Sequence, residues 1–228
     1  MVEGPVRIAL LAAVDRALSV QQPAVEAHIA RVRRGRPDAL PGEIIKRLER
    51  QLLGATTSSG AAVGAAAAAP GVGLAVAATI SAGESVAFLE AAALFSLAIA
   101  EIHGVRVSDL EHRRTLFLAI MLGESGAASV GAVAERTGQH WARQLVQRIP
   151  MAKISAVNKV LGKNFVTKYG TRQGIVVLSR TIPFGVGAII GGGANAAIAS
   201  GVIKSARRAF GPAPRIWPET GDEGAVPV

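Results

Sequence analysis

Residues 181–203, TIPFGVGAIIGGGANAAIASGVI, form a run of 23 residues without a charged side chain. A membrane-spanning helix needs about 20 predominantly apolar residues, so the length of this run permits a span. Arg180 precedes the run, and basic residues follow it at Lys204, Arg207 and Arg208. Because cations flank both ends, the positive charges assign no orientation to such a span.

Small residues recur at four-residue intervals within the same run. Gly187 and Gly191 form a GxxxG pair, and Gly193, Ala197 and Gly201 continue the spacing on a second track. Small residues four apart allow two helix backbones to approach closely, in lipid or in a protein core. We therefore expect a glycine-zipper-like helix that packs against another helix.

A second charge-free tract, residues 51–83, is rich in alanine and glycine and carries a Pro-Gly pair at 70–71. Such a pair marks a break, so the tract predicts a helical hairpin whose second arm continues toward residue 102. Gly60 and Gly64 form another GxxxG pair in the first arm. We expect the C-terminal glycine helix to pack against this arm.

The rest of the chain shows apolar residues at helical spacing and little period-2 alternation, which predicts an all-α, multi-helix bundle built around the hairpin and the glycine helix. We expect one domain over residues 1–211, with an N-terminal helix in 1–37 and a core in 38–211. Residues 212–228 are rich in proline, which predicts a disordered tail. The expected boundaries are a break at Pro23, a helix start near Pro41, a capping box from Ser108 to Glu111, and further helices over 126–149 and 151–163.

The formal net charge of +9 is unevenly distributed, because residues 136–210 contain no Asp or Glu. This asymmetry points to an anionic partner such as membrane lipid headgroups, although a solvated basic face explains it equally well. The helix over 151–163 is amphipathic and basic, which suits an anionic membrane interface or a solvent-facing helix of a bundle. The candidate surface contacts are Lys153, Lys159, Lys163, Lys168, Arg172, Lys204, Arg207 and Arg208.

Several classes of chemistry are excluded or disfavoured by composition and motif. The chain has no cysteine, which excludes disulfides, thiol catalysis and cysteine-ligated metals. Phosphate-binding loops, nucleophile elbows and zinc-protease motifs are absent, and the spacing of the four histidines favours no metal site. We expect no cofactor, and nucleic acid is disfavoured because no aromatic residue is interleaved with a basic run.

A few polar residues stand in otherwise apolar segments. Glu84 and Glu90 do so in the return arm of the hairpin, and Asn195 does so in the glycine run. A carboxylate in lipid marks a functional site or a pairing, whereas in a soluble bundle it is more often on the surface or ion-paired. Arg180 is a candidate partner for Glu84. The hypothesis that the protein is an enzyme would rest on Glu84, Glu90 and Asn195.

Several segments are distinctive as a set: the Ala/Gly tract, EIHGVRVSDLEHRRTLFLAIMLGESG, VNKVLGKNF, and most specifically Ile182–Pro183–Phe184 and Arg207–Arg208–Ala209–Phe210–Gly211. Together they resemble the EcsC family of bacterial proteins over residues 40–211. The family is named from a gene beside an ABC-transporter operon. The resemblance implies a link to membrane or transport processes, with a membrane transporter as a candidate partner, and it implies no catalytic residues.

Three hypotheses about function follow. The first is a non-enzymatic accessory protein at the cytoplasmic face of the membrane, either peripheral or partly inserted through the hairpin and the glycine helix, with anionic lipids as its partners. The second is a soluble, cytoplasmic all-α protein that binds a lipid or another apolar ligand in its core. The third is an enzyme of unknown type. Whether the protein forms an oligomer stays open.

Overall fold

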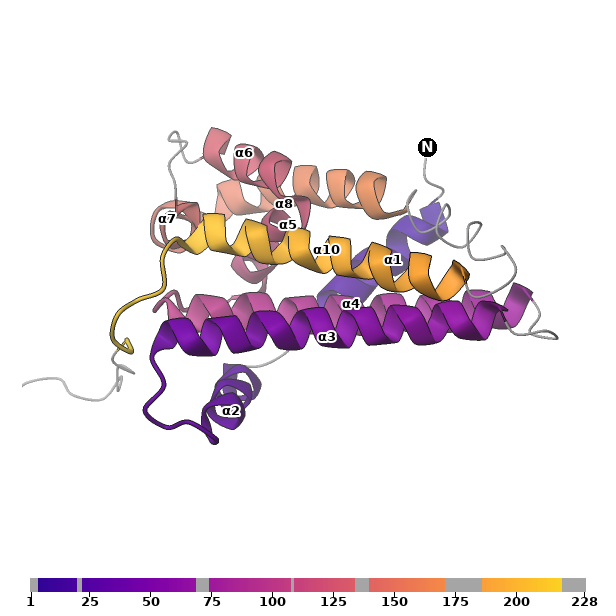
Figure 1. The fold of residues 1–228 in the computed structure, drawn as a ribbon. Coiled ribbons are helices and arrows are strands. Elements are labelled where there is room, and N and C mark those ends of the chain that lie inside the picture. Colours follow the sequence, from indigo (N-terminus) through magenta and orange to yellow (C-terminus); the bar gives the residue numbers. More distant parts are fainter. Residues whose placement is uncertain are drawn as a thin grey trace, which may run out of the picture.

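The computed structural model describes residues 4–19, 22–68, 74–107, 109–133, 140–170 and 186–218. Every regular element in these ranges is helical, which confirms the predicted all-α bundle (Figure 1). In chain order the elements are α1 (Gly4–Leu18), α2 (Gln22–Arg33), α3 (Pro41–Ala68), α4 (Leu74–Ile102), α5 (Leu110–Leu122), α6 (Glu124–Val133), α7 (Trp141–Arg148), α8 (Met151–Phe165), the π-helical turn η1 (Val166–Gly170) and α10 (Val186–Phe210).

The long helices α3 and α4 pack against each other as the two arms of the predicted hairpin (Figure 1). The predicted break at Pro70 lies outside the described residues. α3 runs without interruption from Pro41 to Ala68, so the amphipathic segment at its start and the Ala/Gly arm form a single helix. α10 lies antiparallel along α3, and these two helices share the most extensive contact between any two of the described elements (Figure 1). The predicted partnership between the two small-residue tracts is therefore confirmed for the helices that carry them.

The centre of the bundle is α5, which contacts α1, α4, α6, α7, α8 and α10. Residues 115–122 of α5 are all buried, and Leu116, Phe117 and Leu118 are at most 1% exposed. A helix that is apolar on every side belongs inside a core, because no face of it gains by meeting water. The second half of α4 is buried in the same way over residues 95–100. α2 lies on the other side of the hairpin from α6 and α8 (Figure 1).

Local signals explain how α5 begins and ends. The N-cap is Asp109, whose Oδ1 accepts a hydrogen bond from the backbone N–H of His112 at 2.9 Å. The predicted capping box named Ser108 as the cap and was wrong by one residue; Asp109 has the extended backbone that an N-cap needs (φ −95°, ψ 153°). At the other end Gly123 has φ +72°, a conformation that favours glycine and lets the chain turn directly into α6.

The single helix predicted over 126–149 is wrong at its C-terminal end, because α7 begins as a separate helix at Trp141. The preceding residue, His140, has φ +69°, and a right-handed helix does not continue through a left-handed residue. α6 ends at Val133, and the intervening residues 134–139 lie outside the described ranges. At the N-terminus the predicted break also exists, but it falls before α2, so Pro23 occupies the first turn of α2, where proline is tolerated.

The first part of the tail predicted to be disordered has a defined position against the bundle. Trp217 Nε1 donates a hydrogen bond to the carbonyl of Ala39 at 3.1 Å, and the Arg33 guanidinium lies 4.0 Å from the centre of the indole ring. Pro218 lies close to Gly104. The prediction therefore does not hold for residues 212–218, because one aromatic side chain with a donor and a cation to pack on anchors them. Residues 219–228 lie outside the described residues.

Candidate functional site

The glycine track predicted to mediate helix packing faces outward in α10. Gly193 and Gly201 are exposed, and a Cβ added at either position would meet open space. Ala197, between them, is exposed as well. The predicted packing role of Gly193 and Gly201 is therefore wrong. The buried side of the helix carries Ala199, Val202, Ile203, Ala206 and Ala209 instead. The surroundings of Gly187, Gly191, Gly60 and Gly64 lie outside the described residues.

Of the polar residues that stand in apolar segments, the structure describes the side chains of Asn195 and Glu90. Asn195 is half-buried, and its Nδ2 donates to the carbonyl of Thr56 in α3 at 3.3 Å, so this side chain joins α10 to α3. The Glu90 carboxylate lies 3.5 Å from Arg16 Nε in α1, and its side chain is 46% exposed. Glu90 is thus a partly hydrated ion-pair partner. The side chain of Glu84 and the whole of Arg180 lie outside the described residues.

Three of the predicted basic contacts form a continuous arc on α8. Lys153, Lys159 and Lys163 are all exposed, while the opposite side of the helix buries Ile154, Val157 and Leu161 in the core. Two large apolar side chains border the same solvent-facing arc, Met151 at 48% and Val160 at 51% exposure. We call these five residues, Met151, Lys153, Lys159, Val160 and Lys163, the α8 basic face.

The remaining predicted basic contacts have other positions. Lys168 turns inward, and its Nζ donates to the carbonyls of Met121 and Leu122 at 3.1 and 3.2 Å, where a cation offsets the negative end of α5. Arg207 pairs with Glu49 through two hydrogen bonds of 2.7 and 2.6 Å. Arg208 pairs with Glu124 in α6. Lys204 is exposed on α10, and Arg172 lies outside the described residues. Lys168 therefore lies against the end of α5, contrary to its predicted surface role. Arg207 and Arg208 pair with neighbouring helices while more than half of each side chain stays exposed, so their predicted role at the surface stays a prediction.

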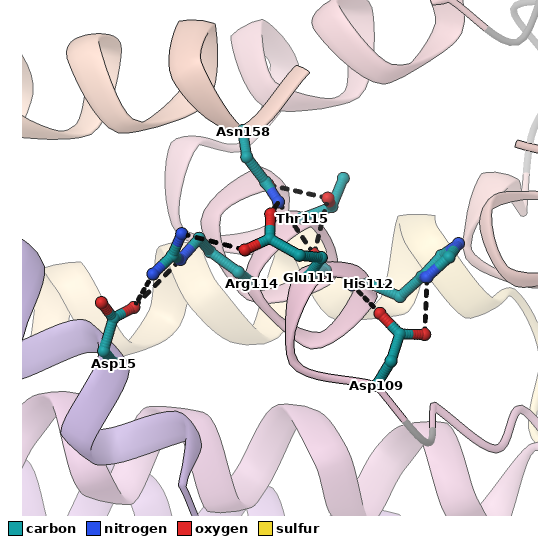
Figure 2. Close-up of polar contacts among 7 residues, drawn as sticks. All are labelled: Asp15, Asp109, Glu111, His112, Arg114, Thr115 and Asn158. Atoms are coloured by element: carbon teal, nitrogen blue, oxygen red, sulfur yellow. Dashed lines mark hydrogen bonds and ion pairs between the residues drawn. The ribbon is translucent and has the colours of Figure 1, made fainter. Parts of the chain in front are cut away.

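A polar cluster that was not predicted joins α5 to α8 and α1 (Figure 2). Asn158 of α8 donates through Nδ2 to the Glu111 carbonyl at 2.9 Å and to the Glu111 carboxylate at 2.7 Å. The Thr115 hydroxyl donates to Asn158 Oδ1 at 2.7 Å. Asn158 and Thr115 are buried, so these bonds satisfy groups that would otherwise be costly to bury. The one signal in the sequence was an asparagine on the apolar side of the α8 pattern.

The same cluster extends to either side along α5. Arg114 connects Asp15 of α1 with Glu111 (Figure 2). Its Nε donates to Asp15 Oδ1 at 2.9 Å, and its Nη1 donates to Glu111 Oε1 at 3.2 Å. These bonds with Asp15 raise the pKa of Arg114. His112 is buried, its Nδ1 lies 2.7 Å from Asp109 Oδ2, and its Nε2 lies 3.4 Å from the carbonyl of Ile149.

The His112–Asp109 pair resembles the base and orienting carboxylate of a hydrolase only in part. Burial acts to raise the pKa of Asp109, but the hydrogen bonds and charge of His112 outweigh it and lower the pKa below its usual value. A general base needs a nitrogen directed at a substrate proton. Nε2 of His112 instead faces a backbone carbonyl inside the bundle. The cluster therefore positions helices, and we assign it no catalytic role.

Two further observations bear on ligands and membranes. No group of three or more His, Asp or Glu side chains in the described residues is arranged to hold a metal ion. Within the same residues, one segment, Ser85–Ile102 in α4, is long and apolar enough to cross a membrane, and 56% of it is buried inside the bundle. The core helix of a soluble protein has the same properties, so this segment is weak support for a span.

Comparisons with known proteins add no relative: no family model, no curated protein and no solved structure matches the chain. The resemblance to the EcsC family stays a prediction.

Proposed function

We propose that this protein is a helical, non-enzymatic accessory protein that associates with the anionic, cytoplasmic face of a membrane, with the α8 basic face as its contact. The observation that carries this proposal is the composition of that face. Three exposed lysines share it with two exposed apolar side chains. The stretch that contains α8, positions 136–210, has no acidic residue.

The energetics favour reversible, peripheral attachment. Each basic residue close to an anionic leaflet contributes about 1 kcal/mol, so three lysines contribute about 3 kcal/mol. Met151 and Val160 border the lysines and are placed to enter the headgroup region, where apolar contact adds to the attraction. Attachment of this kind leaves the core intact, because the buried side of α8 stays packed on α5. A role beside a membrane transporter remains a prediction that the EcsC resemblance implies.

Vesicle co-sedimentation tests the proposal. The protein is mixed with phosphatidylcholine vesicles that contain or lack phosphatidylglycerol, at low salt and at about 0.5 M salt, where electrostatic attraction is screened. We expect binding to the anionic vesicles only, and release by salt. The variant Lys153→Gln/Lys159→Gln/Lys163→Gln should bind up to about 100-fold more weakly, the factor that corresponds to about 3 kcal/mol.

The matched control removes three positive charges elsewhere. Arg31, Arg34 and Arg36 are exposed at the C-terminal end of α2 and beyond it. The variant Arg31→Gln/Arg34→Gln/Arg36→Gln should bind like the unmodified protein. Equal losses in the two variants would show that net charge alone drives binding and would overturn the assignment to α8. Native membranes that retain the protein through salt and carbonate and release it only in detergent would indicate insertion of the hairpin instead.

A further inference from the structure

A pocket of about 490 Å³ opens between the start of α3, the ends of α4 and α10, and the segment that follows α10. Its volume falls within the range of about 300–1,000 Å³ that is typical of small-molecule sites. Its walls are mainly apolar, and they include Ile45 of α3, Phe95 and Ile99 of α4, Ala206 of α10, and Pro212 and Ala213. The pocket is remote in sequence from α8 and makes no use of the α8 basic face.

The charged side chains that line the pocket, Lys46, Glu49 and Arg207, lie on α3 and α10, and His103 and His140 line it as well. Glu49, which is 6% exposed, and Arg207 form an ion pair in which Arg207 uses Nε and Nη2. Nη1 takes no part in that pair. Lys46 lies one turn before Glu49 on α3 and also lines the pocket, and its side chain is exposed. Because Arg207 neutralises Glu49, the net charge contributed by these three residues is positive.

We propose that this pocket binds an amphipathic monocarboxylate, such as a medium-chain fatty acid. The apolar chain of the ligand packs against Ile45, Phe95 and Ile99, and its carboxylate lies between Lys46 and the outer edge of Arg207. Arginine and lysine donors recognise a carboxylate through charge-assisted hydrogen bonds, and apolar walls with a few polar groups are typical of such sites. An ammonium headgroup would meet like charge at the same position, so the pocket discriminates by the sign of the headgroup.

Isothermal titration calorimetry on the full-length chain tests this with three probes of equal chain length: decanoate, decanol and decylammonium, each below its micellar concentration. We expect decanoate to bind at least tenfold more tightly than decylammonium. Lys46→Glu should weaken the binding of decanoate at least tenfold. The same substitution should reduce the difference in affinity between decanoate and decylammonium. Ala213→Phe, which places a large side chain in the pocket, should reduce the binding of all three probes.

Two controls locate the effect. Lys204→Glu makes the same charge change on an exposed site of α10 that does not line the pocket, and it should leave decanoate binding unchanged. The triple glutamine variant of the α8 basic face should also leave it unchanged, which separates this pocket from adsorption to α8. Circular dichroism establishes that each variant is folded. Failure of every probe to bind, or binding that is lost in the α8 variant and kept in Lys46→Glu and Ala213→Phe, would overturn the proposal.

Discussion

At the scale of single residues, His103 shows how burial controls the protonation of one side chain. Its Nδ1 lies 2.8 Å from the carbonyl of Ile99 one turn earlier, which assigns the ring proton to Nδ1. The ring stacks on Phe210, with 5.2 Å between ring centres, and Nε2 is buried without a hydrogen-bond partner in the described residues. Burial lowers the pKa of His103, although the carbonyls of Ile99, Pro212 and Gly211 act in the opposite direction.

This shift makes stability depend on pH. Below the ordinary histidine value of 6.5 the unfolded chain takes up a proton that the folded chain does not, until the lowered folded-state pKa is reached. The free energy of unfolding should therefore fall as the pH is lowered from 7 to 5. In His103→Gln the fall should be smaller, as measured by urea denaturation at each pH.

A second histidine contributes in the same direction, because burial and then the charge of Arg31 lower the pKa of His28. The free energy of unfolding of His103→Gln should therefore still fall between pH 7 and pH 5. The fall should be smaller again when His28→Gln is added. An identical slope in the parent and in His103→Gln would contradict the account of His103.

At the scale of elements, the same residue type has opposite roles in two helices. Gly126, near the start of α6, is buried where that helix crosses α5, and a Cβ there would lie 2.4 Å from the carbonyl oxygen of Ala119. Gly201, inside α10, faces open space. The four-residue spacing of small residues drew attention to Gly201, although Gly126 is the glycine that permits a close helix crossing.

Substitution by alanine at these two positions should therefore have opposite effects. Gly126→Ala should destabilise the protein by about 1–3 kcal/mol, because the added methyl group overpacks a backbone contact. Gly201→Ala should stabilise it by about 0.5–1 kcal/mol, because alanine is the better helix former where nothing obstructs it. Urea denaturation of the two variants measures both changes, and changes of the same sign would contradict the packing described for α6 and α10.

At the scale of the whole molecule, α3 and α10 join the beginning and the end of the bundle. The Glu49–Arg207 pair links them near the N-terminal end of α3 and the C-terminal end of α10, and the hydrogen bonds with Glu49 raise the pKa of Arg207. The Glu49 side chain is 8% exposed and that of Arg207 is 65% exposed. The carboxylate therefore depends on this partner more than the guanidinium does.

A double-mutant cycle measures that dependence. Arg207→Met should cost about 1.5–3 kcal/mol, because it leaves a buried carboxylate without its charged donor. Adding Glu49→Gln to Arg207→Met should recover part of the loss, because the buried charge is then gone. Additive effects of the two substitutions, with a coupling below about 0.5 kcal/mol, would show that the pair contributes little to the stability of the fold.

The helices themselves were predictable, because their signals are local. Most helix boundaries follow within a few residues from local signals in the sequence. These signals are apolar residues at helical spacing, Pro23, the cap region before α5 and the two charge-free tracts. Where prediction failed, at the separate start of α7, the deciding feature is the left-handed backbone of His140, which its local sequence did not reveal. The anchoring of residues 212–218 depends on Trp217 reaching Ala39 and Arg33, which a count of prolines does not show.

The sequence alone determined that this chain is helical, that it folds back on itself through two small-residue tracts, and that its positive charge lies in the C-terminal third. Only the tertiary structure decided which glycines pack, which cations pair and which lysines reach solvent. Periodicity depends on neighbours within a few residues, whereas Glu49 and Arg207, or Asn158 and Glu111, meet because distant helices pack side by side. For that reason the lysines of α8 lie on the solvent side of their helix, while Arg207 and Arg208 of α10, equally basic in the sequence, form ion pairs with Glu49 and Glu124.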